Sequence, residues 1–69
     1  MSALETQVGG GHYKDFKIQP IEFIVQNDIG FIEGSIIKYV CRHLEKGGSQ
    51  DLDKVIHYAQ LLKELTYND

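Results

Sequence analysis

The sequence lacks several features that identify common protein classes. Its 69 residues contain one cysteine, one proline and no tryptophan. The lone Cys41 excludes an internal disulfide and is typical of a reducing compartment. No apolar run approaches the roughly 20 residues of a membrane span. The first residues, MSALETQ, have neither a basic nor an apolar stretch, so we expect no signal peptide. The sequence therefore predicts a soluble, cytoplasmic protein with no membrane partner.

Positive charge is also scarce, because seven Lys and Arg residues face ten Asp and Glu residues, giving a net charge of −3. Surfaces that bind duplex nucleic acid are strongly basic, so we expect no duplex nucleic-acid partner. A local pocket for a small anion stays possible. A chain this short buries only about 60% of the surface its unfolded form exposes. With no disulfide and no metal or cofactor expected, self-association is the remaining means of stabilisation, and we predict a homo-oligomer.

Apolar periodicity predicts an all-α fold of about three short helices. Pro20 suits the first position of a helix, where its missing N–H costs nothing. We predict helices over roughly 20–28, 32–46 and 50–65, with the second and third separated by Gly47-Gly48. Residues 1–11 are expected to form a flexible, extended N-terminal arm, since they have no apolar period and end in three glycines. Residues 12–69 then make a single helical domain.

Two glycines carry specific expectations. Gly30 follows Asn27-Asp28, and we expect it to take the left-handed conformation that ends the first helix. Gly34 lies inside the second helix, where it costs about 1 kcal/mol of helix propensity. We therefore expect another backbone or a ligand to approach closely at Gly34 and Ser35.

A row of cations is unusual in an acidic protein. Lys38, Arg42 and Lys46 recur at four-residue steps, and on an ideal helix this row spans roughly 80°. The three side chains suit one multiply charged anion, with Arg42 offering a planar fork and the lysines point charges. Tyr39 lies beside the row, where a ring suits stacking on a base. A solvated face explains the same row, since cations late in a helix also complement its dipole.

Other residues with chemical potential favour structural roles. Asp51 and Asp53 point apart on a helix, which favours capping over an acid/base pair. Cys41 falls on the apolar side of its helix and is expected to be an inert thiol. The three histidines lack the spacing of a metal site. We assign no catalytic residue.

Fragments spaced along the chain resemble a known family. In order, they are His12-Tyr13-Lys14, Gln19-Pro20-Ile21-Glu22, Phe31 with Gly34, Lys38-Tyr39, Arg42, Lys46, Asp51-Leu52, Lys54 and Tyr58. The combination resembles a small tailed-phage domain of unknown function often labelled nucleotide kinase-like, which also occurs within a larger nucleoside monophosphate kinase of T7-type phages. The resemblance covers Gly11 to about Leu62. Ser35 and His57 depart from it, standing where the family favours Asn and Trp.

The resemblance implies a nucleotide-related role in the cytoplasm of an infected bacterium. It marks seven residues as candidate nucleotide or phosphate contacts: His12, Tyr13, Lys14, Lys38, Tyr39, Arg42 and Lys46. We predict a protein that binds a cyclic or modified signalling nucleotide in a pocket between protomers, without catalysis, and so counters anti-phage defence. One alternative is nucleoside monophosphate kinase activity or a kinase remnant. Another is a protein–protein inhibitor of a host factor.

Overall fold

The computed structural model describes residues 16–67, which contain helices and links but no strand. Three α-helices follow one another as α1 (Pro20–Gln26), α2 (Phe31–Arg42) and α3 (Gly48–Tyr67). A wider π-helical turn, η3 (His43–Gly47), joins α2 to α3. The predicted all-α class is therefore confirmed. The predicted N-terminal arm lies outside the described residues.

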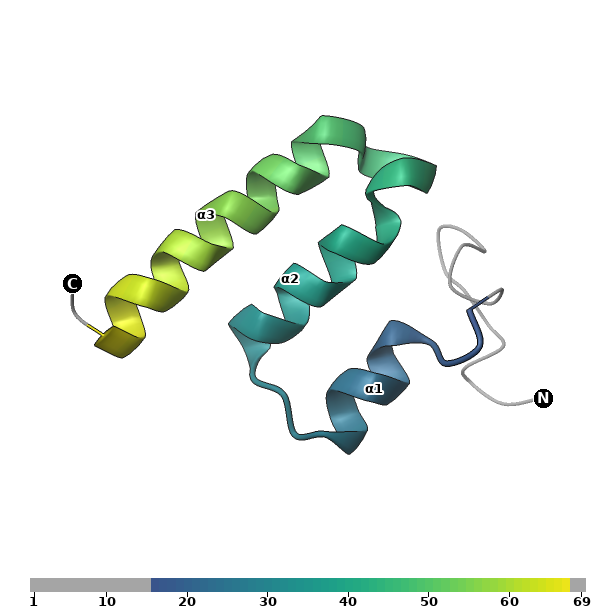
Figure 1. Ribbon diagram of the computed structural model, residues 1–69, viewed down its shortest axis with the longest axis horizontal. Coiled ribbons are helices and arrows are strands. Elements are labelled where there is room, and N and C mark those ends of the chain that lie inside the picture. The colour runs from purple at the N-terminus through teal and green to yellow at the C-terminus, as the bar shows by residue number, and fades with distance from the viewer. Residues whose placement is uncertain (1–15, 68–69) are drawn as a thin grey trace.

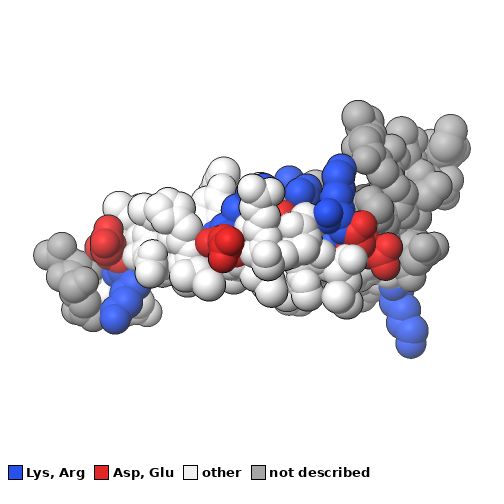
Figure 2. All heavy atoms as spheres, turned by 90° about the horizontal axis from the view of Figure 1, so that it is seen from above, with Lys and Arg blue, Asp and Glu red and all other residues white. Residues whose placement is uncertain are grey.

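The helices form a single layer. Figure 1 shows α2 lying between α1 and α3, with α2 and α3 running antiparallel as a hairpin. No helix among the described residues has both the length and the apolar content needed to cross a bilayer. A single layer gives the hairpin two broad faces, and their chemistry differs. Figure 2 views the layer edge-on and shows basic side chains gathered along one side of its middle, whereas the visible rim on the opposite side is white there.

Local chemistry sets the start and end of α1. Pro20 occupies its first turn as predicted, and the backbone N–H of Gln19 donates to the Glu22 carboxylate at 3.1 Å, satisfying a donor that precedes the helix. The helix ends at Gln26, and Asp28 then takes a positive φ of 53°. The expected left-handed Gly30 is wrong, because Asp28 makes the reversal and Gly30 is extended at the start of α2. Asp is among the few non-glycine residues that tolerate this conformation.

Gly34 is buried where α1 crosses α2. A Cβ added there would lie 3.1 Å from Ile24 Cγ2, tighter than an ordinary van der Waals contact. The expected close approach is present, but the partner is a side chain of α1 and not another backbone or a ligand. The neighbouring Ser35 hydroxyl donates to the Phe31 carbonyl at 2.8 Å, so it bonds within its own helix.

The connection between α2 and α3 differs from the predicted uninterrupted helix and turn. The α-helical hydrogen-bond pattern stops at Arg42, and η3 continues with the wider spacing of a π turn. Gly48 reverses the chain with a φ of 58°, a conformation that side chains disfavour. The third helix begins at this glycine and continues to Tyr67, which is longer than predicted.

Burial in this layer is unusual for a folded domain. No apolar side chain in residues 16–67 is fully buried, and the one large side chain that is fully buried belongs to Asp51. Fixing the backbone of each residue costs about 1–2 kcal/mol, whereas fully burying an aliphatic side chain contributes about 1.5–3 kcal/mol. The apolar stripes of α2 and α3 are only half covered by packing against each other. A single layer of this kind needs a second layer to bury them.

Candidate functional site

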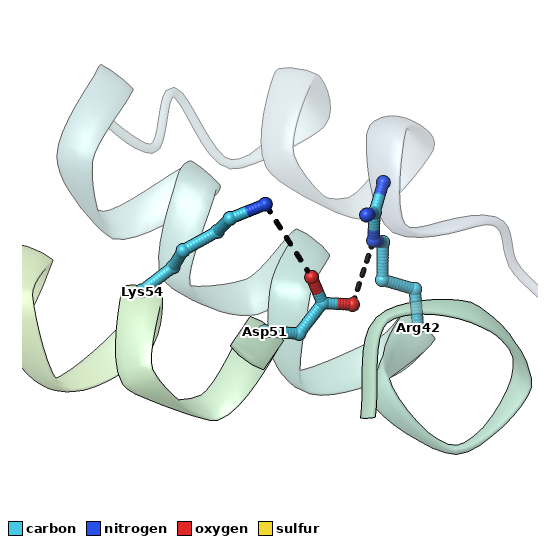
Figure 3. Close-up of polar contacts among 3 residues, drawn as sticks. All are labelled: Arg42, Asp51 and Lys54. Atoms are coloured by element: carbon cyan, nitrogen blue, oxygen red, sulfur yellow. Dashed lines mark hydrogen bonds and ion pairs between the residues drawn. The ribbon is translucent and has the colours of Figure 1, made fainter. Parts of the chain in front are cut away.

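The buried carboxylate of Asp51 is the centre of the charged face of the hairpin. Arg42 Nε at the end of α2 donates to Asp51 Oδ2 on α3 at 2.7 Å. Lys54 Nζ lies 3.7 Å from Asp51 Oδ1, one turn further along α3. Figure 3 shows the two cations flanking the carboxylate from opposite sides. The ion pair thus ties the end of α2 to the start of α3.

The surroundings of Asp51 favour its charged form. The hydrogen bond from Arg42 lowers the pKa of Asp51, burial acts in the opposite direction, and the charges of Arg42 and Lys54 lower the pKa further. The backbone of Gly47, which lies against the carboxylate, also acts to lower the pKa of Asp51. The net direction is downward, so Asp51 remains ionised at neutral pH.

Gly47 is required for this arrangement. A Cβ at Gly47 would coincide with the Asp51 carboxylate, so any other residue would displace the carboxylate from its partners. Asp51 lies in the first turn of α3, after the helix start at Gly48. Its carboxylate pairs with Arg42, the central cation of the predicted row, which the capping prediction did not include. The neighbouring Asp53 is exposed, which agrees with the prediction that the two aspartates point apart.

Three cations lie close to the ring of Tyr39. Lys38 Nζ, Arg42 Cζ and Lys54 Nζ lie 5.5, 5.2 and 4.8 Å from the ring centroid, within the range of cation–π attraction. Tyr58 of α3 stacks against Tyr39, with centroids 6.1 Å apart and ring planes 17° apart. We call Lys38, Tyr39, Arg42, Lys54 and Tyr58 the cation–tyrosine cluster. It brings together positive charge and flat aromatic surface.

An open groove of about 530 Å³ adjoins this cluster. Its lining combines aromatic rings, a cation and hydrogen-bonding groups: Tyr39, Gln50, Asp53, Lys54, His57 and Tyr58. The volume falls within the range of small-molecule sites, about 300–1,000 Å³. The groove is more open than enclosed, so it covers one side of a ligand and leaves the other exposed.

The predicted contacts divide into three groups. Lys38, Tyr39 and Arg42 come together in the cluster. Lys46 is exposed on η3, beyond the end of α2, so the predicted row does not lie on one continuous α-helix. The remaining predicted contacts, at 12–14, lie outside the described residues.

Two members of the cluster were absent from the predicted site. Lys54 and Tyr58 lie on α3, and a helical wheel of α2 alone could not place them beside Tyr39. Both residues belong to the fragments that resemble the kinase-like family, and this resemblance is the sequence feature that could have identified them as site residues. Cys41 is partly buried and burial raises the pKa of its thiol, which agrees with the predicted inert role. Within residues 16–67, no group of three or more His, Cys, Asp or Glu side chains is placed to hold a metal ion.

The model of a protein family described as "protein of unknown function (DUF3310)" matches residues 8–60. The chain belongs to this family. The DUF3310 segment contains α1, α2, η3 and the part of α3 that carries the cation–tyrosine cluster, and it ends before the last turns of α3. No curated protein and no solved structure matches the chain. The DUF3310 description assigns no function, so the predicted nucleotide role stays a prediction.

Proposed function

We propose that the protein binds a nucleotide non-covalently and returns it unchanged. The observation that carries the proposal is the cation–tyrosine cluster, in which three cations lie within 5.5 Å of the centroid of Tyr39, beside the open groove. Like charges held this close raise the local positive potential, which attracts anions. A nucleotide combines the two features this surface suits, a phosphate for the cations and a base for the rings.

The cationic part of the site suits the phosphate, and the aromatic part of the groove suits the base. Phosphate oxygens would meet Lys54, which lines the groove, and Lys38, which lies beside the groove at the Tyr39 ring, with Arg42 held by its bond to Asp51. The base would stack on the aromatic surface of Tyr58 or His57, since base–aromatic stacking tolerates any base. Gln50 offers both donors and an acceptor for the edge of the base.

Binding without reaction is favoured by the state of Asp51. The Asp51 carboxylate contacts Arg42 and Lys54, and it is buried and hydrogen-bonded to Arg42. A carboxylate held ionised in this way stabilises the fold and is shielded from a substrate hydroxyl. Together with the nucleotide-related role that the family resemblance implies, this supports sequestration of a signalling nucleotide in an infected bacterium, which would counter anti-phage defence.

Calorimetric titration with a panel of nucleotides and the matching nucleosides tests the proposal. The variants are Lys38→Gln and Lys54→Gln, with Lys17→Gln as the control that removes an exposed lysine outside the groove lining. A lost charge-assisted hydrogen bond is worth about 1.5–3 kcal/mol, so each cluster variant should bind roughly 10- to 100-fold more weakly. The control should bind like the wild type. Equal losses in all three variants, or equal affinity for nucleoside and nucleotide, would contradict a phosphate site.

The same protein, incubated with ATP and each nucleoside monophosphate, distinguishes binding from catalysis. We expect the nucleotides to be recovered intact. Phosphorylated or hydrolysed product in excess over the protein would overturn the proposal and establish the kinase alternative.

A further inference from the structure

The hairpin carries an apolar patch on the side opposite the cation–tyrosine cluster. At about 100° per residue, Val40 lies one position past Tyr39, and Lys38 one position before it, so the two project to opposite sides of the hairpin. On α3, Leu52 and Ile56 lie about 100° and 140° from Asp51 in one direction, whereas Lys54 lies about 60° in the other. With Leu44 of η3, these residues form what we call the apolar face: Val40, Leu44, Leu52 and Ile56.

These four side chains are far from buried. Their exposed fractions are 46% for Val40, 88% for Leu44, 38% for Leu52 and 57% for Ile56. Contiguous apolar surface of this kind on a small protein marks an interaction site. The helices α2 and α3 are about 18 and 30 Å long and each about 10 Å wide. Together, one side of the two helices therefore has a projected area of roughly 500 Å². Each partner in a standard interface contributes ~800 Å² of accessible surface. The projected area of this face is of the same order.

The register of the hairpin makes the apolar face complementary to itself. The Tyr39–Tyr58 stack and the Arg42–Asp51 ion pair fix which levels of α2 and α3 lie side by side. In that register Val40 is level with Ile56, and Leu44 is level with Leu52. A copy related by a two-fold axis parallel to the helices would place α2 of one chain over α3 of the other, and each level would meet its counterpart.

The rim of the face is complementary in charge under the same symmetry. Glu33 near the start of α2 and Lys63 near the end of α3 are exposed. At about 100° per residue, Glu33 lies about 120° from Tyr39 and Lys63 about 120° from Asp51, on the side of the apolar face, with the Glu33 carboxylate beside Gly30. The two are also level with each other across the hairpin. The two-fold axis would bring Glu33 of each chain beside Lys63 of the other, giving two opposite-charge pairs at one end of the interface.

We propose that the apolar face is the contact between two copies of this chain, which form a two-fold symmetric four-helix bundle. Such isologous contacts are the commonest way for soluble proteins to associate, and antiparallel helices that bury facing apolar rows are the usual construction of a four-helix bundle. The contact supplies the second layer that the single layer lacks. It leaves both grooves on the outer surfaces of the dimer, and in this respect it differs from the predicted pocket between protomers.

Sedimentation velocity and the concentration dependence of the melting temperature test the dimer in the full-length protein. The wild type should sediment as a dimer at micromolar concentration, and its melting temperature should rise with protein concentration. Glu33→Lys should weaken the dimer severalfold, Lys63→Glu should do the same, and the double exchange should restore it. A monomeric wild type whose melting temperature is independent of concentration would overturn the proposal, whatever else covers the face. Dimers that ignore the charge reversals would overturn the two-fold arrangement.

The dimer goes beyond the proposed function, and the two proposals fail separately. Nucleotide titration of the same samples distinguishes them. A dimer that binds no nucleotide supports the interface and contradicts the nucleotide site. A monomer that binds nucleotide does the reverse.

Discussion

Substitution of Ile56 by alanine should weaken the dimer by an amount that follows from its exposure. The change removes three carbons, each worth about 0.8 kcal/mol when transferred from water to an apolar contact. The side chain is 57% exposed in the single chain, so the interface accounts for about 1.4 kcal/mol of the full value of ~2.4 kcal/mol. Both copies carry the change, and the dimer should lose about 2.7 kcal/mol. That corresponds to a dissociation constant raised roughly 100-fold.

The dissociation constant is measured by sedimentation equilibrium over a dilution series. Leu65→Ala is the matched control, because Leu65 is 74% exposed and lies two helical turns beyond Tyr58, on the other face of the hairpin. The control should leave the dissociation constant within a factor of two or three. The reasoning is refuted if Ile56→Ala leaves the constant unchanged, or if Leu65→Ala raises it by the same factor.

Three further predictions concern the hairpin itself. The lowered pKa of Asp51 means that the stability it contributes is fully present above its ordinary value of 3.8 and is lost as pH falls through the folded-state pKa. Asp51→Asn should therefore unfold more easily than the wild type in urea at pH 7, with the gap closing towards pH 2. Gly47→Ala should lower the melting temperature by several degrees, because its Cβ displaces the Asp51 carboxylate, whereas Ala at the exposed Gly30 should have the smaller effect. Gly34→Val should destabilise the fold by about 1–3 kcal/mol through overpacking against Ile24. The loss is measured from the midpoint of urea unfolding, and an unchanged midpoint would show that α1 moves to make room for the valine.

Periodicity was a reliable guide where a residue's role depends on its own helix. Pro20 and the apolar spacing placed the helices, and the i, i+2 separation of Asp51 and Asp53 correctly set them apart. It failed where the backbone departs from ideal geometry. The α-helix ends at Arg42, so Lys46 lies on the π turn and not on the single helix that periodicity predicted. The reversal occurs at Asp28, a residue that only tolerates that conformation.

The candidate site depended on contacts between helices, which a single sequence does not specify. Arg42 was expected to bind an anion, and it does contact one, the Asp51 carboxylate of the same chain. Lys54 and Tyr58 complete the cluster from α3 because the hairpin register brings them level with Tyr39. Gly34 gave a correct signal of close approach, but glycine cannot say which neighbour approaches, and here the neighbour is Ile24.

The proposed function requires a nucleotide to bind at the cation–tyrosine cluster and its groove. Native mass spectrometry of the purified full-length protein, with a nucleotide panel and with any small molecules that copurify, tests this most directly because it reports the protein's stoichiometry and the ligand's mass together. We predict a bound nucleotide of unaltered mass, with one per chain at saturation, and weaker retention by Lys38→Gln than by Lys17→Gln. A protein that retains no nucleotide at any concentration below about a millimolar, or one that releases it with a changed mass, would rule out non-catalytic nucleotide binding at this site.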